Sequence, residues 1–106
     1  MQELARRPDQ FRAARDNPDL IPGLVDEALR WASPVKHFHR IVADDFEFRG
    51  RHLEAGQSVM MMYPSANRDE DVFENPWDFD ITRRPNKHIA FGYGPHQCIG
   101  QHVAKL

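Results

Sequence analysis

The residues best suited to chemistry lie in one glycine-rich stretch, residues 91–100, with the sequence Phe-Gly-Tyr-Gly-Pro-His-Gln-Cys-Ile-Gly. Its three glycines predict tight turns and a close approach of the backbone to a flat or bulky partner. Cys98 is the single cysteine of the chain, and we expect a helix to begin just after it, within residues 99–106. Amide groups at the start of a helix stabilise a thiolate and favour its formation. Cys98 is therefore the first candidate for a reactive or ligating group.

Three kinds of chemistry are open to such a thiolate. A nucleophile needs a base, which His96 can supply, but the local sequence lacks the signature of a cysteine protease. A redox-active thiol needs a resolving cysteine, and the chain has no second cysteine. A lone cysteine in a glycine-rich loop suits the fifth ligand of a haem iron. The single cysteine also excludes an internal disulfide and a multi-cysteine zinc site.

The composition bounds the class of protein around this stretch. The chain has 106 residues, 41% hydrophobic and 28% charged, with a formal net charge of −2. These values are typical of a globular domain and exclude collagen-like, low-complexity and strongly disordered chains. They also exclude a nucleic-acid binder that works by bulk positive charge. No apolar run approaches the roughly 20 residues of a membrane-spanning helix, and no secretory leader is apparent, so we expect a cytoplasmic protein.

The charge is unevenly placed along the chain. Residues 1–80 carry 10 basic and 16 acidic side chains, a net charge of −6, whereas residues 81–106 carry four basic side chains and no acid. Uneven charge is common on small proteins and needs no function. A cationic patch around residues 91–100 would, however, speed the encounter with an acidic partner.

Helices are expected in the first third of the chain. Short helices are predicted over residues 1–7 and 8–15, each bounded by Pro8. Apolar side chains at positions i, i+3, i+4, i+7, i+8 and i+11 predict an amphipathic helix that starts at Ile21 and ends at Ala32. A helical wheel places the polar side chains of this helix opposite its apolar stripe, and so exposes them to solvent.

Beyond residue 36 the periodicity changes to that of strands. Short strand-like runs separated by turn residues predict small antiparallel hairpins. A short helix is expected over residues 63–68, and residues 69–88 show no clear period. Taken together, the elements predict an α+β chain. The expected strands are residues 39–42, 46–48, 51–53 and 57–62.

Residues 91–100 resemble the haem-ligand loop of the cytochrome P450 family, Phe-x-x-Gly-x-His/Arg-x-Cys-x-Gly. Upstream, Glu27 and Arg30 match the Glu-x-x-Arg motif of the family's K helix, and residues 79–83 resemble the segment that supplies the third member of its Glu-Arg-Arg cluster. The resemblance covers nearly the whole chain, from about the J helix to the start of the L helix. All five fixed positions of the loop motif are met, at Phe91, Gly94, His96, Cys98 and Gly100.

The resemblance implies a role for each of these residues. Cys98 would be the axial thiolate ligand of the iron in haem b (iron protoporphyrin IX), with His96 and Arg40 bound to its propionates. Phe91 would pack against the thiolate side of the haem, and the remaining fixed positions, Gly94 and Gly100, would allow close approach to the macrocycle and the following helix. The resemblance also buries a structural ion cluster beneath the irregular segment; its members are Glu27, Arg30 and Arg83.

The implied whole is a bacterial-type monooxygenase of mainly helical fold, of which residues 1–106 are a partial domain without the N-terminal region and the I helix. Its α+β content would comprise a K-helix-like amphipathic helix, small hairpins, an irregular meander, the cysteine-ligand loop and the start of the L helix. The parent enzyme would insert one oxygen atom of O2 into a small hydrophobic organic substrate. Electrons would come from a ferredoxin or flavodoxin-like donor and its reductase.

Two alternatives remain open. In the first, the chain is a non-catalytic product of a truncated or decayed gene, and it binds haem weakly or not at all. In the second it is a small regulatory protein with a redox-active Cys98. In either case the amphipathic helix would lack apolar partners, so we expect exposed apolar patches and aggregation of the isolated chain. We also expect the isolated chain to be inactive.

Overall fold

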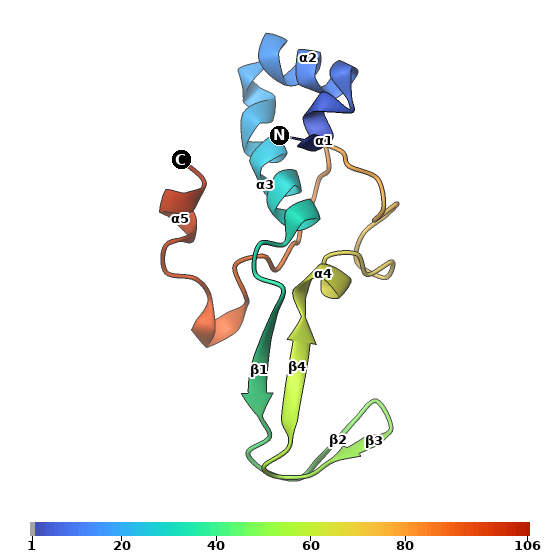
Figure 1. Cartoon of the computed structure of the whole chain (residues 1–106), viewed down its shortest axis with the longest axis vertical. Helices are drawn as coiled ribbons and strands as arrows, with labels where there is room; N and C mark the ends of the chain where they lie inside the picture. Colours follow the sequence, from blue (N-terminus) through green and yellow to red (C-terminus); the bar gives the residue numbers. More distant parts are fainter. Residues whose placement is uncertain (1) are drawn as a thin grey trace.

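The computed structural model describes residues 2–106 as an elongated body of 53 × 28 × 22 Å. Helices occupy one end, and two small sheets extend from it toward the other (Figure 1). The last segment of the chain returns to lie beside the longest helix, α3. The helical elements in chain order are α1 (Gln2–Ala5), α2 (Pro8–Asp16), the 3-10 turn η1 (Pro18–Leu20), α3 (Ile21–Ala32), α4 (Tyr63–Ala66), the 3-10 turn η2 (Gly94–His96) and α5 (Gln101–Ala104).

Helix α3 has the bounds that its apolar spacing predicts. Pro22 lies in its first turn, where a missing N–H costs nothing because that group has no partner within the helix. Ser33 caps the C-terminus of the helix. It has a φ of +39° and donates its N–H to the carbonyl of Leu29 at 2.9 Å. This left-handed residue turns the chain out of the helix and into the first strand.

The two inner strands have the predicted bounds, the first strand begins two residues earlier and ends one residue earlier than predicted, and the last begins one residue later. Their pairing is antiparallel throughout. Strands β2 (Phe46–Phe48) and β3 (Arg51–Leu53) form a hairpin. Its turn residues, Arg49 and Gly50, both have positive φ, as the favoured two-residue turn requires. Around this hairpin, β1 (His37–Ile41) pairs with β4 (Ser58–Met62) along the full length of both strands. The predicted small hairpins are therefore one inner hairpin and one enclosing strand pair.

A small apolar core joins the first helices to the irregular segment that follows α4. Phe79 and Ile81 come from this segment, which we call the meander (residues 67–86), and they are buried against Leu4 and Ala14. The ring of Trp31 on α3 meets that of Phe79 edge to face at 5.8 Å. The meander is therefore fixed in place although it contains no helix or strand.

Gln10 on α2 attaches the meander to the helical end a second time. Its side-chain Nε2 donates to the carbonyl of Phe79 at 2.7 Å, and its Oε1 accepts from the N–H of Ile81 at 3.1 Å. One amide side chain thus satisfies two backbone groups of a segment that has no regular backbone partners.

A groove along α3 is lined mainly by apolar side chains that the chain does not cover. Every residue of β1 is exposed as well. The expectation of exposed apolar surface is met on both elements. Among residues 2–106 no helix has the length and hydropathy required to cross a bilayer. The groove residues on α3 are Leu24, Val25, Ala28, Leu29, Trp31 and Ala32.

Candidate functional site

The glycine-rich stretch folds into a closed loop. Gly92 and Gly94 both have a φ of +75°, a conformation that other residues adopt only with strain. The N–H of Cys98 donates to the carbonyl of Phe91 at 2.8 Å and so joins the two sides of the loop. A side chain at Gly92 would also lie 3.4 Å from the hydroxyl of Tyr63. Two glycines are therefore required by the backbone path itself.

Cys98 lies on the outside of this loop. Its residue surface is exposed, and its thiol is free. Three residues later α5 begins, with the N–H of Gln101 bound to the carbonyl of Cys98 at 3.3 Å. The helix expected within residues 99–106 is thus present as a single turn. A thiol in this position is accessible to a ligand that approaches the open side of the loop.

The other fixed positions of the motif differ in their surroundings. His96 is exposed, at the end of η2. Phe91 is half-buried, with its ring 6.2 Å from that of His88. A Cβ at Gly94 would meet no atom of residues 2–106 within 4 Å, so space is open at this position. A Cβ at Gly100 would lie 4.0 Å from the Cys98 sulfur, an ordinary contact.

Arg40 lies on β1, away from the loop in sequence. It is exposed, donates to the carbonyl of His39 at 3.0 Å, and stacks on the ring of Phe38 at 5.9 Å. Its backbone pairs with Val59 of β4, and its guanidinium contacts within residues 2–106 are with β1. The structure therefore leaves the guanidinium free to bind a group outside residues 2–106, and does not bring it to the cysteine loop.

Glu27 and Arg30 have no exposed surface, so the exposure expected from the helical wheel is wrong. The meander covers this face of α3. Arg30 binds the Glu27 carboxylate through two parallel hydrogen bonds of 2.7 and 2.8 Å. Its remaining donors bind carbonyl oxygens of Asn67, Pro76 and Asp78 at 2.8–3.0 Å. All five N–H groups of the guanidinium are therefore used.

The Glu27 carboxylate is satisfied as completely as its partner. It accepts from the N–H of Asp80 at 2.9 Å and from the amide of Asn86 at 3.0 Å. Arg83 approaches it at 3.3 Å. These bonds supply partners to a buried charge that would otherwise be costly.

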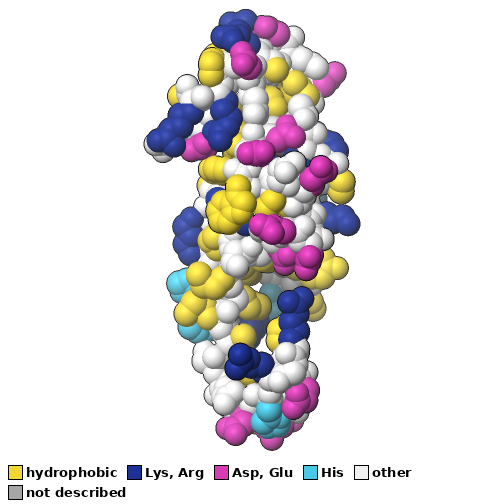
Figure 2. Space-filling view, turned by 90° about the vertical axis from the view of Figure 1, so that its right-hand side faces the viewer, with side chains coloured by type: hydrophobic (Ala, Val, Ile, Leu, Met, Phe, Trp, Pro, Cys, Tyr) yellow, Lys and Arg dark blue, Asp and Glu magenta, His cyan; other side chains and the backbone are white. Residues whose placement is uncertain are grey.

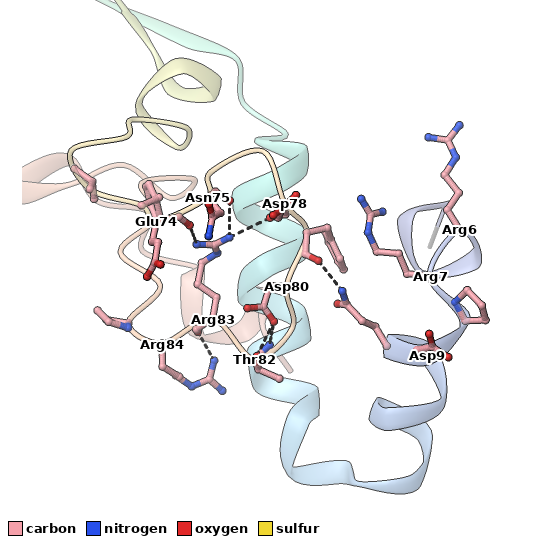
Figure 3. Close-up of a pocket in the computed structure, with 16 residues that line it drawn as sticks. Arg6, Arg7, Asp9, Glu74, Asn75, Asp78, Asp80, Thr82, Arg83 and Arg84 are labelled. Carbon is pink, nitrogen blue, oxygen red and sulfur yellow. Dashed lines mark hydrogen bonds between the residues drawn. The ribbon is translucent and has the colours of Figure 1, made fainter.

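Arg83 also holds the meander from its outer side (Figure 3). Its guanidinium donates to the carbonyls of Glu74, Asn75 and Asp78 at 2.6–3.1 Å. The three charged residues of the predicted cluster are thus in contact. Together they bind the backbone of the meander at many points, in place of regular hydrogen bonding.

Asn67 is a buried residue to which the sequence assigned no role. Its side chain donates to the Ser33 hydroxyl at 2.8 Å and accepts from the N–H of Ile89 at 2.8 Å. It joins the end of α3 to the start of the cysteine loop. The local sequence gives no signal for this, because an asparagine after a short helix is usually a cap or turn residue.

A second site that sequence reasoning missed centres on Asp26, the neighbour of Glu27. One carboxylate oxygen of Asp26 lies 2.8 Å from the Lys105 ammonium and 3.4 Å from Nε2 of His88. Burial of the imidazole lowers the pKa of His88, although Asp26 acts in the opposite direction. Partial burial acts to raise the pKa of Asp26, but the bonds from Lys105 and His88 outweigh it and hold that pKa below its usual value.

The histidines do not form a metal site. Among residues 2–106, no group of three or more histidine, cysteine, aspartate or glutamate side chains is placed to hold a metal ion. Any metal at Cys98 would therefore take its other ligands from outside residues 2–106.

Comparison with known proteins shows the family. The family model for cytochrome P450 matches residues 10–106. The chain is 56% identical over 103 residues to cytochrome P450-terp of Pseudomonas sp., and 45% identical over 105 residues to the steroid C26-monooxygenase of Mycobacterium tuberculosis. This chain belongs to the cytochrome P450 family.

Solved structures agree. The structure of CYP109E1 from Bacillus megaterium in complex with corticosterone superposes with a TM-score of 0.94 at 40% identity. CYP108D1 from Novosphingobium aromaticivorans superposes with a TM-score of 0.91 at 47% identity. The α+β elements described above are therefore those of a segment of the P450 fold.

The chain spans about a quarter of the length of these relatives. The matches cover 97% and 99% of the chain but 24% and 28% of the two curated proteins. For the two structures the corresponding shares are 96% and 97% of the chain, and 28% and 25% of the structure.

The thiol, imidazole and guanidinium that this chain exposes are suited to hold a haem. Cys98 offers one exposed thiol, the ligand type that P450 iron takes. The open space beside Gly94 leaves room for a flat macrocycle at the same loop. His96 and Arg40 are exposed donors suited to carboxylates.

Proposed function

We propose that this chain is the haem-binding segment of a P450-type monooxygenase, and that the Cys98 thiolate is the axial ligand of haem b. The observation that carries the proposal is the exposed Cys98 thiol on a loop closed by two positive-φ glycines. Membership of the P450 family supports it. The buried Glu27–Arg30 pair supports it further, since it holds on α3 the meander that precedes the loop.

The residues of the chain would then have distinct tasks. Cys98 would hold the iron through its thiolate, which would supply electron density to it, and His96 and Arg40 would hold the propionate carboxylates. Phe91 shields the thiolate side of the loop from water. When bound, the haem supplies the oxygen activation by which one atom of O2 enters an organic substrate.

The substrate we propose is a small hydrophobic organic molecule. Relatives are consistent with this class: CYP109E1 structures are described with corticosterone and with testosterone, and P450BioI with an acyl carrier protein that bears hexadec-9Z-enoic acid. The residues that would select among such molecules lie in the part of the relatives that this chain does not match.

We propose a ferredoxin or flavodoxin-like electron donor, with its reductase, as the partner of the whole cytoplasmic enzyme. Residues 81–106 carry four basic side chains and no acid. Arg83 and Lys105 are paired with Glu27 and Asp26, and Arg84 and Lys87 remain exposed and favour an acidic protein at this end. Surface ion pairs weaken as ionic strength rises, because salt screens them over about 10 Å at 0.1 M. Binding of an acidic ferredoxin should therefore weaken with added salt, and binding that is indifferent to salt would remove this part of the proposal.

A carbon monoxide difference spectrum tests the haem ligand. The chain is reconstituted with haem, reduced and exposed to the gas, beside a Cys98→Ala variant. The expected result is the band of a thiolate-ligated ferrous haem in the wild type and its loss in the variant. The same band in Cys98→Ala would exclude this thiolate. No band in the wild type would favour the alternative of a non-catalytic product.

A further inference from the structure

Two neighbouring carboxylates on α3 bind two different parts of the chain. Glu27 binds the meander, as described above. Asp26 points to the other side and binds residues that flank the cysteine loop on both ends. His88 precedes the loop by three residues, and Lys105 follows the turn of α5. Figure 1 shows this last segment running alongside α3.

The side chains in the middle of the cysteine loop do little to hold the loop on α3. Tyr93 is 87% exposed and Ile99 fully exposed, so neither side chain packs on α3. The bonds within the loop, such as the one from Cys98 to Phe91, fix its shape but not its position on the helix. Helix α5 is one turn long, and a helix of that length is unstable without outside contacts. The position of Cys98 relative to α3 must therefore depend on the loop ends.

Asn67 holds the start of the loop through the N–H of Ile89, and two further contacts, one at each end, meet on the side chain of Asp26. The His88 side chain is 5% exposed, and the Asp26 side chain 30%. The Lys105 ammonium lies 2.8 Å from Asp26 and also 5.6 Å above the ring of Phe91, the first residue of the loop. The same ring faces His88. Asp26, His88, Lys105 and Phe91 thus form one connected group, which we call the Asp26 clamp.

We propose that Asp26 is a positioning residue: by holding His88 and Lys105 together, it fixes the cysteine loop on α3 and so sets the position of the Cys98 thiol. The inference rests on the proposed function only in taking this thiol as a haem ligand. It predicts that breaking the clamp loosens residues 98–105 and leaves α3 unchanged. No contact of Asp26 with the haem or substrate is involved.

Amide hydrogen exchange tests the clamp without haem. The variants are Asp26→Asn, Asp26→Glu and Lys105→Met. The matched controls, Asp19→Asn and Lys87→Met, remove the same charges at exposed positions. Because a partly exposed ion pair stabilises by up to about 1 kcal/mol, Asp26→Asn and Lys105→Met should speed exchange at Gln101 and Ala104 about two- to fivefold. Asp26→Glu should restore part of the protection, and the controls should change nothing.

The outcomes separate the clamp from a general loss of fold. Exchange rates at Gln101 and Ala104 that stay at wild-type values in both Asp26→Asn and Lys105→Met would overturn the proposal. If Asp26→Asn also speeds exchange within α3, the variant has lost more than the clamp. Lys105→Met then decides, because Lys105 is an exposed residue near the C-terminus whose loss cannot unfold α3 directly.

A second measurement connects the clamp to the thiolate. In haem-loaded chain, Asp26→Asn and Lys105→Met should show a smaller share of the thiolate-type carbon monoxide band than the wild type, with Asp26→Glu in between. An unchanged share of this band in both variants would overturn the proposal that Asp26 positions the Cys98 thiol. If the wild type itself lacks the band, the proposed function fails, and the exchange result still decides whether the clamp exists.

Discussion

Arg30 is a charged side chain with no solvent contact, and its five donors all find acceptors. A buried ion pair of this kind adds little net stability compared with apolar residues, because both charges lose their hydration. Its effect is on geometry: three of its acceptors are backbone carbonyls of the meander. Removing one partner of the pair is strongly destabilising, because it leaves the other charge buried and unpaired.

Replacing Arg30 with methionine should lower the free energy of unfolding by about 3–5 kcal/mol. Arg30→Lys should be nearly as damaging, because an ammonium has three donors and no planar fork for Glu27. Urea unfolding followed by tryptophan fluorescence measures both variants, because the ring of Trp31 lies 5.7 Å from the guanidinium; Trp77, the second tryptophan, is exposed. Arg12→Met, in an exposed pair with Asp9, is the matched control and should change stability little. Wild-type stability in Arg30→Lys would contradict the role of the fork.

His88 and Asp26 make stability depend on pH. The pKa of His88 is lowered from 6.5 by burial, so below about pH 6.5 the unfolded chain takes up a proton that the folded chain resists. Stability is therefore complete above this pH and falls as the solution is acidified. The pKa of Asp26 is lowered from 3.8, so its contribution to folding stability is present above that pH and is lost as the pH falls further.

Unfolding curves between pH 8 and pH 4 measure the histidine effect. His88→Gln should remove the fall in stability that begins near pH 6.5. His52→Gln, at an exposed position in β3, should leave the fall in place and so serves as the control. A fall of the same size in His88→Gln and the wild type would show that another group is responsible.

Among the elements, α3 and the strands were predictable and their partners were not. The 3.6-residue spacing of apolar side chains gives the bounds of α3, since those side chains are neighbours in sequence. The pairing of His37 with Met62 joins residues far apart in the chain, and no local pattern specifies it. The burial of Glu27 was invisible to a helical wheel for the same reason: the meander that covers it contains no periodic signal.

In the candidate site too, residues of a local motif were predictable and contacts between distant residues were not. Phe91, Gly94 and Cys98 were identified from the spacing of a local motif. The contacts of Asp26 with His88 and Lys105 were not, because Asp26 and His88 lie 62 positions apart and each of these three side chains alone is an ordinary polar one. Asn67 was missed on similar grounds.

The cysteine loop depends on glycine at specific positions. Gly94→Ala should weaken the loop by about 1 kcal/mol, because a φ of +75° places a Cβ against the following carbonyl. Gly100 has a φ of −87°, so Gly100→Ala should leave the haem-free loop intact. Exchange at the Cys98 amide, bound to the carbonyl of Phe91, reports on both variants. Equal protection in the two variants would contradict the requirement for glycine at Gly94.

The molecule as a whole is long and thin, with its small core confined to the helical end. Much of its apolar surface is exposed, including the groove along α3, all of β1 and alternate residues of β4. Figure 2 shows apolar side chains between acidic and basic ones over one face of the body. Exposed apolar area on this scale favours contact with other surfaces.

At high protein concentration the isolated chain should therefore self-associate and lose a sharp thermal transition, so the unfolding measurements above are made on dilute chain. Leu29→Gln places a polar group in the α3 groove and should raise the fraction of monomer in sedimentation velocity runs. Val72→Gln, at an exposed position in the meander, is the control and should have a smaller effect. A monomeric wild type with one cooperative melting transition would show that the exposed groove does not drive association.

The two adjacent carboxylates of α3 also bear on the order in which the chain folds. Each binds a segment more than 50 positions away along the sequence, so each contact closes a long stretch of chain. Such closures are slow compared with the winding of a helix. Helix α3 would therefore be complete before the meander and the cysteine loop find their places on it. The loop that carries the thiol should be among the last parts to order and the first to detach, so that weakening either carboxylate contact accelerates unfolding and leaves the folding rate nearly unchanged.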